Sequence, residues 1–412
     1  MMGSCPGKFK TTITVIVLSL ITGMTIGGWA RPAEGAVRIG IVLPFSGEMA
    51  TLGEHLSEVF RFTVGELRRR GDLKGDSLEL IFGDTGGNPA TARAAVERLI
   101  SQDRVTTLIG GISGEATWAM TSIAQRRQIP FLITTASADS LTRQGWDYIF
   151  RLSLPATEQL AAFAAFIDTA TRGIRNAAVL HDNSRLGPYR SDQLLRLWHA
   201  RDIETILISG FPALSRDFRP LLAKAKVKTP DLIYLLFSSA DAPLVLRQAH
   251  ELRLNAKMII GEAAGFGDPE HLQEDAAMAE HMCVLVQWAP KAPYPGVSDF
   301  VEAFRELNDK MPDYRAAQVY AGMQVLVDAM RRARRPSPQS LRRALAKTSI
   351  ATVYGRVKFE NDNGHTNQNR PPMLILQWID QQQKIVWPRK LASKRLVFPR
   401  PEWRQKQLGF PQ

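Results

Sequence analysis

The sequence contains little cysteine and few aromatic side chains. Only Cys5 and Cys283 carry thiols, and 8% of the 412 residues are aromatic. If the N-terminal segment that holds Cys5 is removed, no internal disulfide can form, so stability has to come from apolar cores. A chain of this length exceeds what one core usually organises, and we therefore expect two domains.

Long apolar runs are also scarce, and the main one lies at the start. Residues 11–30 carry no charge and follow Lys8 and Lys10, which is the layout of a secretory signal. We expect cleavage after Ala30 or near Gly35; a retained membrane anchor is the alternative, because about twenty uncharged residues can span a bilayer. In both cases the remainder is exported to the periplasm, since the basic flank stays inside.

Acidic residues are outnumbered, with 40 Asp and Glu against 52 Lys and Arg. Much of the basic excess lies in residues 331–335 and 384–406. Nucleic-acid binding requires basic residues interleaved with exposed aromatics or a known motif, and export makes such a partner improbable. We expect a solvated basic surface near an anionic membrane and no nucleic-acid partner.

Motifs for catalysis and metal binding are missing as well. Residues 111–114 lack the final glycine of a nucleophile turn, and residues 110–111 lack the Lys-Ser/Thr of a phosphate loop. A group of acidic, imidazole and thiol side chains matches no standard zinc spacing. Its members are Glu270, His271, Glu274, His281 and Cys283. The sequence therefore predicts no catalytic residue, no metal and no cofactor.

What is present is an alternation of short apolar and longer amphipathic segments, which is typical of a parallel α/β sheet. The first series comprises strands 38–43, 78–82, 107–109 and 131–134 with helices 49–70, 88–103 and 116–127. Asn88 can cap the second of these helices and Pro89 suits its first turn. Its predicted apolar face consists of Ala92, Ala95, Val96, Leu99 and Ile100.

The alternation restarts after residue 154, which predicts a second, similar lobe. The expected helices are 158–171, 189–201, 217–225 and 242–252, and the strands are 177–181, 204–208, 232–236 and 257–260. Residues 297–347 are rich in helix, with a buried stripe formed by Tyr320, Met323, Leu326, Val327 and Met330. A last strand pair, 373–378 and 384–387, flanks a turn at 380–383.

Five segments carry a family resemblance in their order and spacing. They are IVLPFSGEMATLGE (41–54), GDTGGNPATARAAVERLISQDRVTTLIGG (83–111), IPFLITTASADSLT (129–142), AAVLHDNSRLG (177–187) and PDLIYLLFSSADAPLVLRQAHELRL (230–254). Over residues 37–387 the chain resembles the leucine/isoleucine/valine-binding proteins, the type I periplasmic solute-binding proteins of ABC transporters.

The resemblance implies two Rossmann-like lobes that are joined by hinge strands and close on a ligand. The implied division is a signal peptide at 1–35, lobe one at 36–152 and 290–370, lobe two at 153–289 and 371–390, and a basic tail at 391–412. It implies capture of a small carboxylated ligand, an amino acid or similar compound, and delivery to the permease of an ABC transporter. A receptor that signals through a membrane partner is the alternative.

The resemblance also implies specific ligand contacts. Open α/β sheets bind ligands beyond the carboxyl ends of their strands, where helix amides suit a carboxylate. Ser113 and Gly114 are similar to a first carboxylate clamp, and Ser137 to a second. The Ala136 carbonyl and Glu262 would face an ammonium group, although a serine in such a position can simply cap a helix.

Three positions depart from the family pattern. Leu186 stands where the amino-acid binders carry a tyrosine, Ser238 and Ser239 replace another aromatic, and an aromatic is missing around Leu52. We therefore expect small or aliphatic pocket walls, with Leu186 and Ser238 among the ligand contacts. The identity of the ligand stays open.

Overall fold

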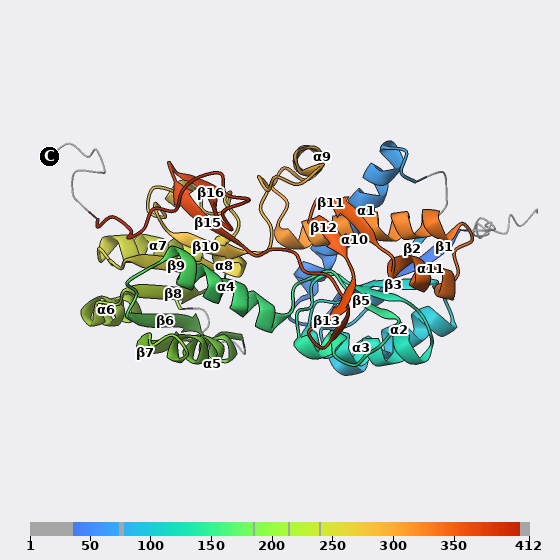
Figure 1. Ribbon diagram of the computed structural model, residues 1–412, viewed down its shortest axis with the longest axis horizontal. Helices are drawn as coiled ribbons and strands as arrows, with labels where there is room; N and C mark the ends of the chain where they lie inside the picture. The colour runs from blue at the N-terminus through green and yellow to red at the C-terminus, as the bar shows by residue number, and fades with distance from the viewer. Residues whose placement is uncertain (1–35, 74–77, 184–185, 213–214, 239, 404–412) are drawn as a thin grey trace, which may run out of the picture.

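The computed structural model describes residues 36–73, 78–183, 186–212, 215–238 and 240–403. The predicted signal peptide and the last residues of the predicted tail lie outside this range. The two lobes lie side by side along the long axis of the molecule (Figure 1), and within the described residues each contains a seven-stranded sheet with helices on both faces. The predicted two-lobed α/β fold is confirmed.

The first lobe is built on a sheet with the strand order β13-β14-β5-β4-β3-β1-β2. Its strands are β1 (Val37–Leu43), β2 (Leu78–Asp84), β3 (Thr107–Gly110), β4 (Phe131–Ile133), β5 (Ile149–Arg151), β13 (Glu360–Asp362) and β14 (His365–Gln368). Its helices are α1 (Ala50–Arg69), α2 (Pro89–Ser101), α3 (Gly114–Arg126), α9 (Val297–Asn308), α10 (Tyr314–Ala333) and α11 (Pro338–Leu345). A hairpin of β11 (Ser349–Thr352) and β12 (Gly355–Lys358) precedes β13.

The second lobe has the strand order β16-β15-β10-β9-β8-β6-β7. Its strands are β6 (Asn176–Asp182), β7 (Glu204–Phe211), β8 (Leu232–Leu236), β9 (Met258–Glu262), β10 (Cys283–Val286), β15 (Leu374–Ile379) and β16 (Gln382–Trp387). Its helices are α4 (Ala156–Ala170), α5 (Leu186–His199), α6 (Arg219–Lys228), α7 (Ala242–Glu251) and α8 (Ala263–Phe266).

Two local predictions are confirmed in detail. The side chain of Asn88 accepts hydrogen bonds from the amides of Ala90 and Thr91, and Pro89 occupies the first turn of α2. The predicted stripe on α10 is buried, so its large apolar side chains each contribute about 1.5–3 kcal/mol to folding. This stripe comprises Tyr320, Met323, Leu326, Val327 and Met330.

The chain passes between the lobes three times, within residues 152–155, 287–296 and 369–373 (Figure 1). At the second crossing the indole of Trp288 is buried and donates a hydrogen bond to the Val353 carbonyl at 2.8 Å. This crossing is therefore anchored in the first lobe. Because β5 runs into the first crossing and β10 into the second, the carboxyl ends of these strands point toward the space between the lobes.

Part of the predicted basic tail packs on the second lobe. The Val397 amide donates to Gln377 at 2.8 Å, and the Arg400 amide donates to the Lys257 carbonyl at 2.8 Å. Within the part of the chain that the structure describes, no helix has both the length and the apolarity needed to cross a membrane.

Candidate functional site

The first lobe forms its side of the site where β3 ends. Gly110 and Gly111 adopt φ angles of 127° and 84°, which side chains rarely allow. A Cβ atom at Gly110 would lie 2.4 Å from the Val42 carbonyl oxygen, so the chain can pass this close to β1 only with glycine. The two glycines turn the chain from β3 directly into α3.

Ser113 and Gly114 begin α3. Ser113 is the N-cap, but its hydroxyl accepts only a long hydrogen bond of 3.5 Å from the Ala116 amide. The Gly114 amide donates to no other described residue. An unpaired amide at the positive end of a thirteen-residue helix is a donor available to an anion.

The loop after β4 lies against this helix start. The Ala136 amide donates to the Gly111 carbonyl at 3.0 Å, while the Ala136 carbonyl accepts from the Ser153 hydroxyl at 2.9 Å. The Ser137 carbonyl accepts from the Ala156 amide at 2.8 Å. Within the described chain the amide and hydroxyl of Ser137 have no partner, whereas the Ala136 carbonyl already has one.

These loops border an open cavity of about 740 Å³. Three helix N-termini contribute to its lining, through Pro89 of α2, Gly114 of α3 and Ala156 of α4. Their aligned peptide dipoles and the guanidinium of Arg93 favour a negative charge in the cavity, whereas the carboxylate of Glu115, which also lines it, opposes one. A larger groove of about 1030 Å³ is lined by residues of α1, by its C-cap Arg70 and by residues of α9, and includes no strand residue among those described.

Aromatic side chains face the cavity after all, contrary to the expectation of small or aliphatic walls. Trp118, on the first turns of α3, lines it and stacks on Trp146 with ring centroids 5.3 Å apart. Tyr189 of α5 reaches it from the second lobe and is 55% exposed. The cavity therefore contains residues from both lobes.

Glu262 lies at the end of β9 and is already paired. Its carboxylate is 2.8 Å from the Arg190 guanidinium and accepts a hydrogen bond of 2.9 Å from the Tyr234 hydroxyl. The adjacent Glu262 charge raises the pKa of Arg190, although burial alone would lower it. Burial and then the Glu262 charge raise the pKa of Tyr234 well above its ordinary value. Glu262 does not line the cavity.

The remaining predicted second-lobe contacts are Ser238 and Leu186. The Ser238 hydroxyl donates to the Asp241 carboxylate at 2.6 Å, immediately before α7. Leu186 is the first residue of α5. Ser239 and the neighbouring loop residues 184–185 lie outside the described residues. A ligand role for Ser238 or Leu186 stays a prediction.

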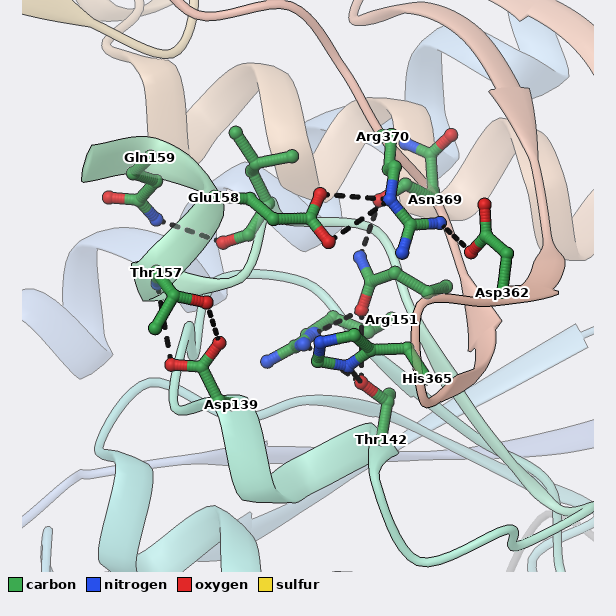
Figure 2. A network of polar contacts seen from close by, with 12 residues as sticks. Asp139, Thr142, Arg151, Thr157, Glu158, Gln159, Asp362, His365, Asn369 and Arg370 are labelled. Atoms are coloured by element: carbon green, nitrogen blue, oxygen red, sulfur yellow. Dashed lines mark hydrogen bonds and ion pairs between the residues drawn. The ribbon is translucent and has the colours of Figure 1, made fainter. Parts of the chain in front are cut away.

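A polar network fastens the hinge beside the cavity (Figure 2). Arg370, on the third crossing, donates to Glu158 of α4 at 2.8 Å and also pairs with Asp362. Asp139 accepts hydrogen bonds from the hydroxyl and amide of Thr157, at the start of α4. The loop that carries Ser137 is thus linked to both the first and the third crossings.

Sequence reasoning missed several residues of the site. Trp118 has a helical spacing that a core residue would share, so no local signal separated it from the core. Tyr189 begins the helix predicted for residues 189–201, which follows the carboxyl end of a strand, where open α/β sheets bind their ligands. That position was the signal available for Tyr189.

Comparisons with known proteins agree with this architecture. The family model described as periplasmic binding protein matches residues 36–383. The chain is 23% identical over 403 residues to Leu/Ile/Val-binding protein homolog 7 of Brucella melitensis, covering 95% of this chain and 99% of that protein.

Two solved structures are also similar in fold. The substrate-binding protein LivJ of Streptococcus pneumoniae, in complex with isoleucine, gives a TM-score of 0.70 at 20% identity, with 86% of this chain and all of that one covered. A solute-binding protein of R. palustris, in complex with benzoate, gives a TM-score of 0.68 at 20% identity. The match covers 85% of this chain and 96% of that one. The chain belongs to the periplasmic binding protein family and is accordingly a solute-binding protein that acts outside the cytoplasm, not an enzyme.

Proposed function

We propose that this protein captures a small carboxylate-bearing ligand, of the amino-acid class, between its lobes and delivers it to the permease of an ABC transporter. The observation that carries the proposal is the pair of unpaired donors at the cavity, the Gly114 amide and the Ser137 amide with its hydroxyl. Charge-assisted hydrogen bonds from such donors to a carboxylate are roughly twice as strong as neutral ones.

A second candidate ligand is an aromatic carboxylate without an ammonium group. Two observations favour it: Glu262 is paired with Arg190, and Trp118 and Tyr189 offer rings to a flat ligand. The relative from R. palustris holds benzoate, which supports the same ligand class.

A thermal-shift screen with matched ligands tests the proposal. We would compare leucine with 4-methylpentanoate and leucinamide, and benzoate with benzamide. Ligands that bind only the folded state stabilise it by roughly 2.7 kcal/mol at a hundredfold excess over Kd. A larger increase in melting temperature with leucine than with 4-methylpentanoate supports the amino-acid class, and an increase with benzoate supports the aromatic acids. Stabilisation by the amides alone contradicts a carboxylate clamp.

Closure gives a second, independent test. Solute-binding proteins close around the ligand by hinge motion, so small-angle X-ray scattering should report a smaller radius of gyration when the stabilising ligand is saturating. Identical scattering profiles with and without that ligand would argue against delivery by a closed form.

A further inference from the structure

The last residue of β5, Arg151, is an arginine with no exposed surface. Its guanidinium donates to three uncharged acceptors: the Gln368 amide oxygen at 2.6 Å, the Ala138 carbonyl at 2.6 Å and the Thr142 hydroxyl at 2.8 Å. Among the described residues it forms no ion pair. A buried cation without a counter-charge is costly, so its retention calls for a reason.

The charged groups around Arg151 have other partners (Figure 2). Asp139 bonds to Thr157 and lies 4.0 Å from Arg143, and Glu158 pairs with Arg370. These carboxylates are 18% and 25% exposed, and Arg143 is 49% exposed, so solvent screens them more than it screens Arg151. The one imidazole in the network, His365, bonds to Thr142.

Arg151 also touches the loop that borders the cavity. Ala138, which accepts its hydrogen bond, follows Ser137 directly, and both line the cavity. The guanidinium is thus buried and bonded to the residue next to Ser137, whose amide and hydroxyl have no partner among the described residues. Burial lowers the pKa of Arg151 to about 10, so the group is still charged at neutral pH.

We propose that the buried charge of Arg151 makes the cavity selective for anions. It does so together with Arg93 by outweighing the carboxylate of Glu115 in the cavity lining and those of Asp139 and Glu158 nearby, and by holding the Ser137 loop in place. This inference names the residue that sets the charge preference of the proposed ligand site, and it rests on the proposed function. In a low-dielectric surrounding a single charge acts more strongly than the same charge in water. Arg151 is therefore a positioning and selectivity residue rather than a direct ligand contact.

A thiol at position 137 reports the local potential without any ligand. The Ser137→Cys variant is made in a chain that begins at Ala36, which leaves Cys283 as the only native thiol. Cys283 is buried and its pKa is raised to about 12, so it does not compete for a water-soluble alkylating reagent. The pH dependence of the iodoacetamide reaction rate gives the pKa of the new thiol.

We expect a thiol pKa at least about one unit below the ordinary 8.5, and a rise of at least about one unit when Arg151→Gln is added. Arg143→Gln is the matched control, because it removes an equal but half-exposed charge, and should shift the thiol pKa by less than about 0.3 units. A pKa of 8.5 or more in Ser137→Cys overturns the proposal even if Arg151→Gln fails to fold. So does an unchanged pKa in a folded Arg151→Gln variant.

Arg151→Lys separates charge from shape. It keeps the charge but loses the fork that binds three acceptors, so the thiol pKa should stay low if charge sets the preference. A pKa equal to that of the Arg151→Gln variant contradicts this. The ligand screen and the thiol pKa test different statements. If only amides bind while the thiol pKa is low and depends on Arg151, the proposed function is wrong but the charge effect of Arg151 stands.

Discussion

The carboxylate of Glu262 lies 2.8 Å from the guanidinium of Arg190, and the two side chains are only 14% and 13% exposed. The pair connects the end of β9 to α5, the helix whose Tyr189 lines the cavity. Arg190 thus occupies the Glu262 carboxylate, which the family resemblance assigned to the ammonium group of the ligand. If Glu262 binds the ligand ammonium group, its ion pair with Arg190 must break, or its carboxylate must contact Arg190 and the ligand at the same time.

Glu262→Gln should destabilise the protein by about 2–3 kcal/mol, because it leaves the nearly buried Arg190 without its counter-charge. Urea unfolding measures the loss. The double variant Arg190→Gln, Glu262→Gln should recover most of it, since both charges are then absent. A loss below about 0.5 kcal/mol in the single variant would place the pair among weak surface bridges.

The same variant tests the ammonium role. If Glu262 binds the ligand nitrogen, Glu262→Gln should weaken leucine but leave 4-methylpentanoate nearly unchanged in calorimetric titrations. Equal losses for both ligands would remove Glu262 from the site.

Ser137→Ala should weaken every carboxylated ligand by about 1–2 kcal/mol, because one donor is lost while the backbone amide remains. Ser140→Ala is the matched control, since Ser140 lines the same cavity farther along the loop. Titration calorimetry with leucine and benzoate gives both values. An equal effect of the two substitutions would mean that Ser137 has no special contact.

Trp118 should report ligand binding by its fluorescence, because it lines the cavity and stacks on Trp146. A ligand that enters the cavity changes the surroundings of this ring pair. Trp118→Phe should lose most of the intensity change, whereas Trp403→Phe, at the end of the described chain, should keep it. Retention of the full change in Trp118→Phe would place the ligand elsewhere.

Stability should fall below neutral pH, partly because of His365. Burial, followed by the charges of Arg151 and Arg143, lowers the pKa of His365 in the native state. The unfolded state, with a pKa of about 6.5, therefore takes up the proton first. The stabilising contribution is complete above about pH 6.5 and is lost as the pH falls through the native pKa.

His365→Gln should flatten this dependence in unfolding midpoints measured between about pH 7.5 and pH 5. It should do so only in part, because burial also lowers the pKa values of His55 and His281. An unchanged slope would show that His365 does not contribute.

The sequence allowed the two lobes and much of the first-lobe site to be predicted. Parallel strands end at one edge of their sheet, so residues after β3 and β4 had to meet, and the structure brings Gly114 and Ser137 to one cavity. Asn88 and Pro89 marked a helix start through their own chemistry. The ligand role of these residues stays a prediction.

Other features depend on contacts between distant parts of the chain. The strands β5, β13 and β14 have three or four residues, too few for an alternating pattern to show. The pairing of Arg190 with Glu262 joins separate elements, as does that of Arg151 with Gln368. The spacing of these residues along the sequence does not predict that they pair, because only the fold brings them together.

One hydrogen bond between the lobes constrains the amino-acid sequence at one of its two positions more than at the other. The Glu270 carboxylate accepts a hydrogen bond of 2.7 Å from the backbone amide of Met311, in the turn between α9 and α10. Because the donor is backbone, almost any residue except proline at position 311 preserves the contact, whereas position 270 needs an acceptor of matching length. Homologous chains that keep the bridge should therefore vary more at position 311 than at position 270.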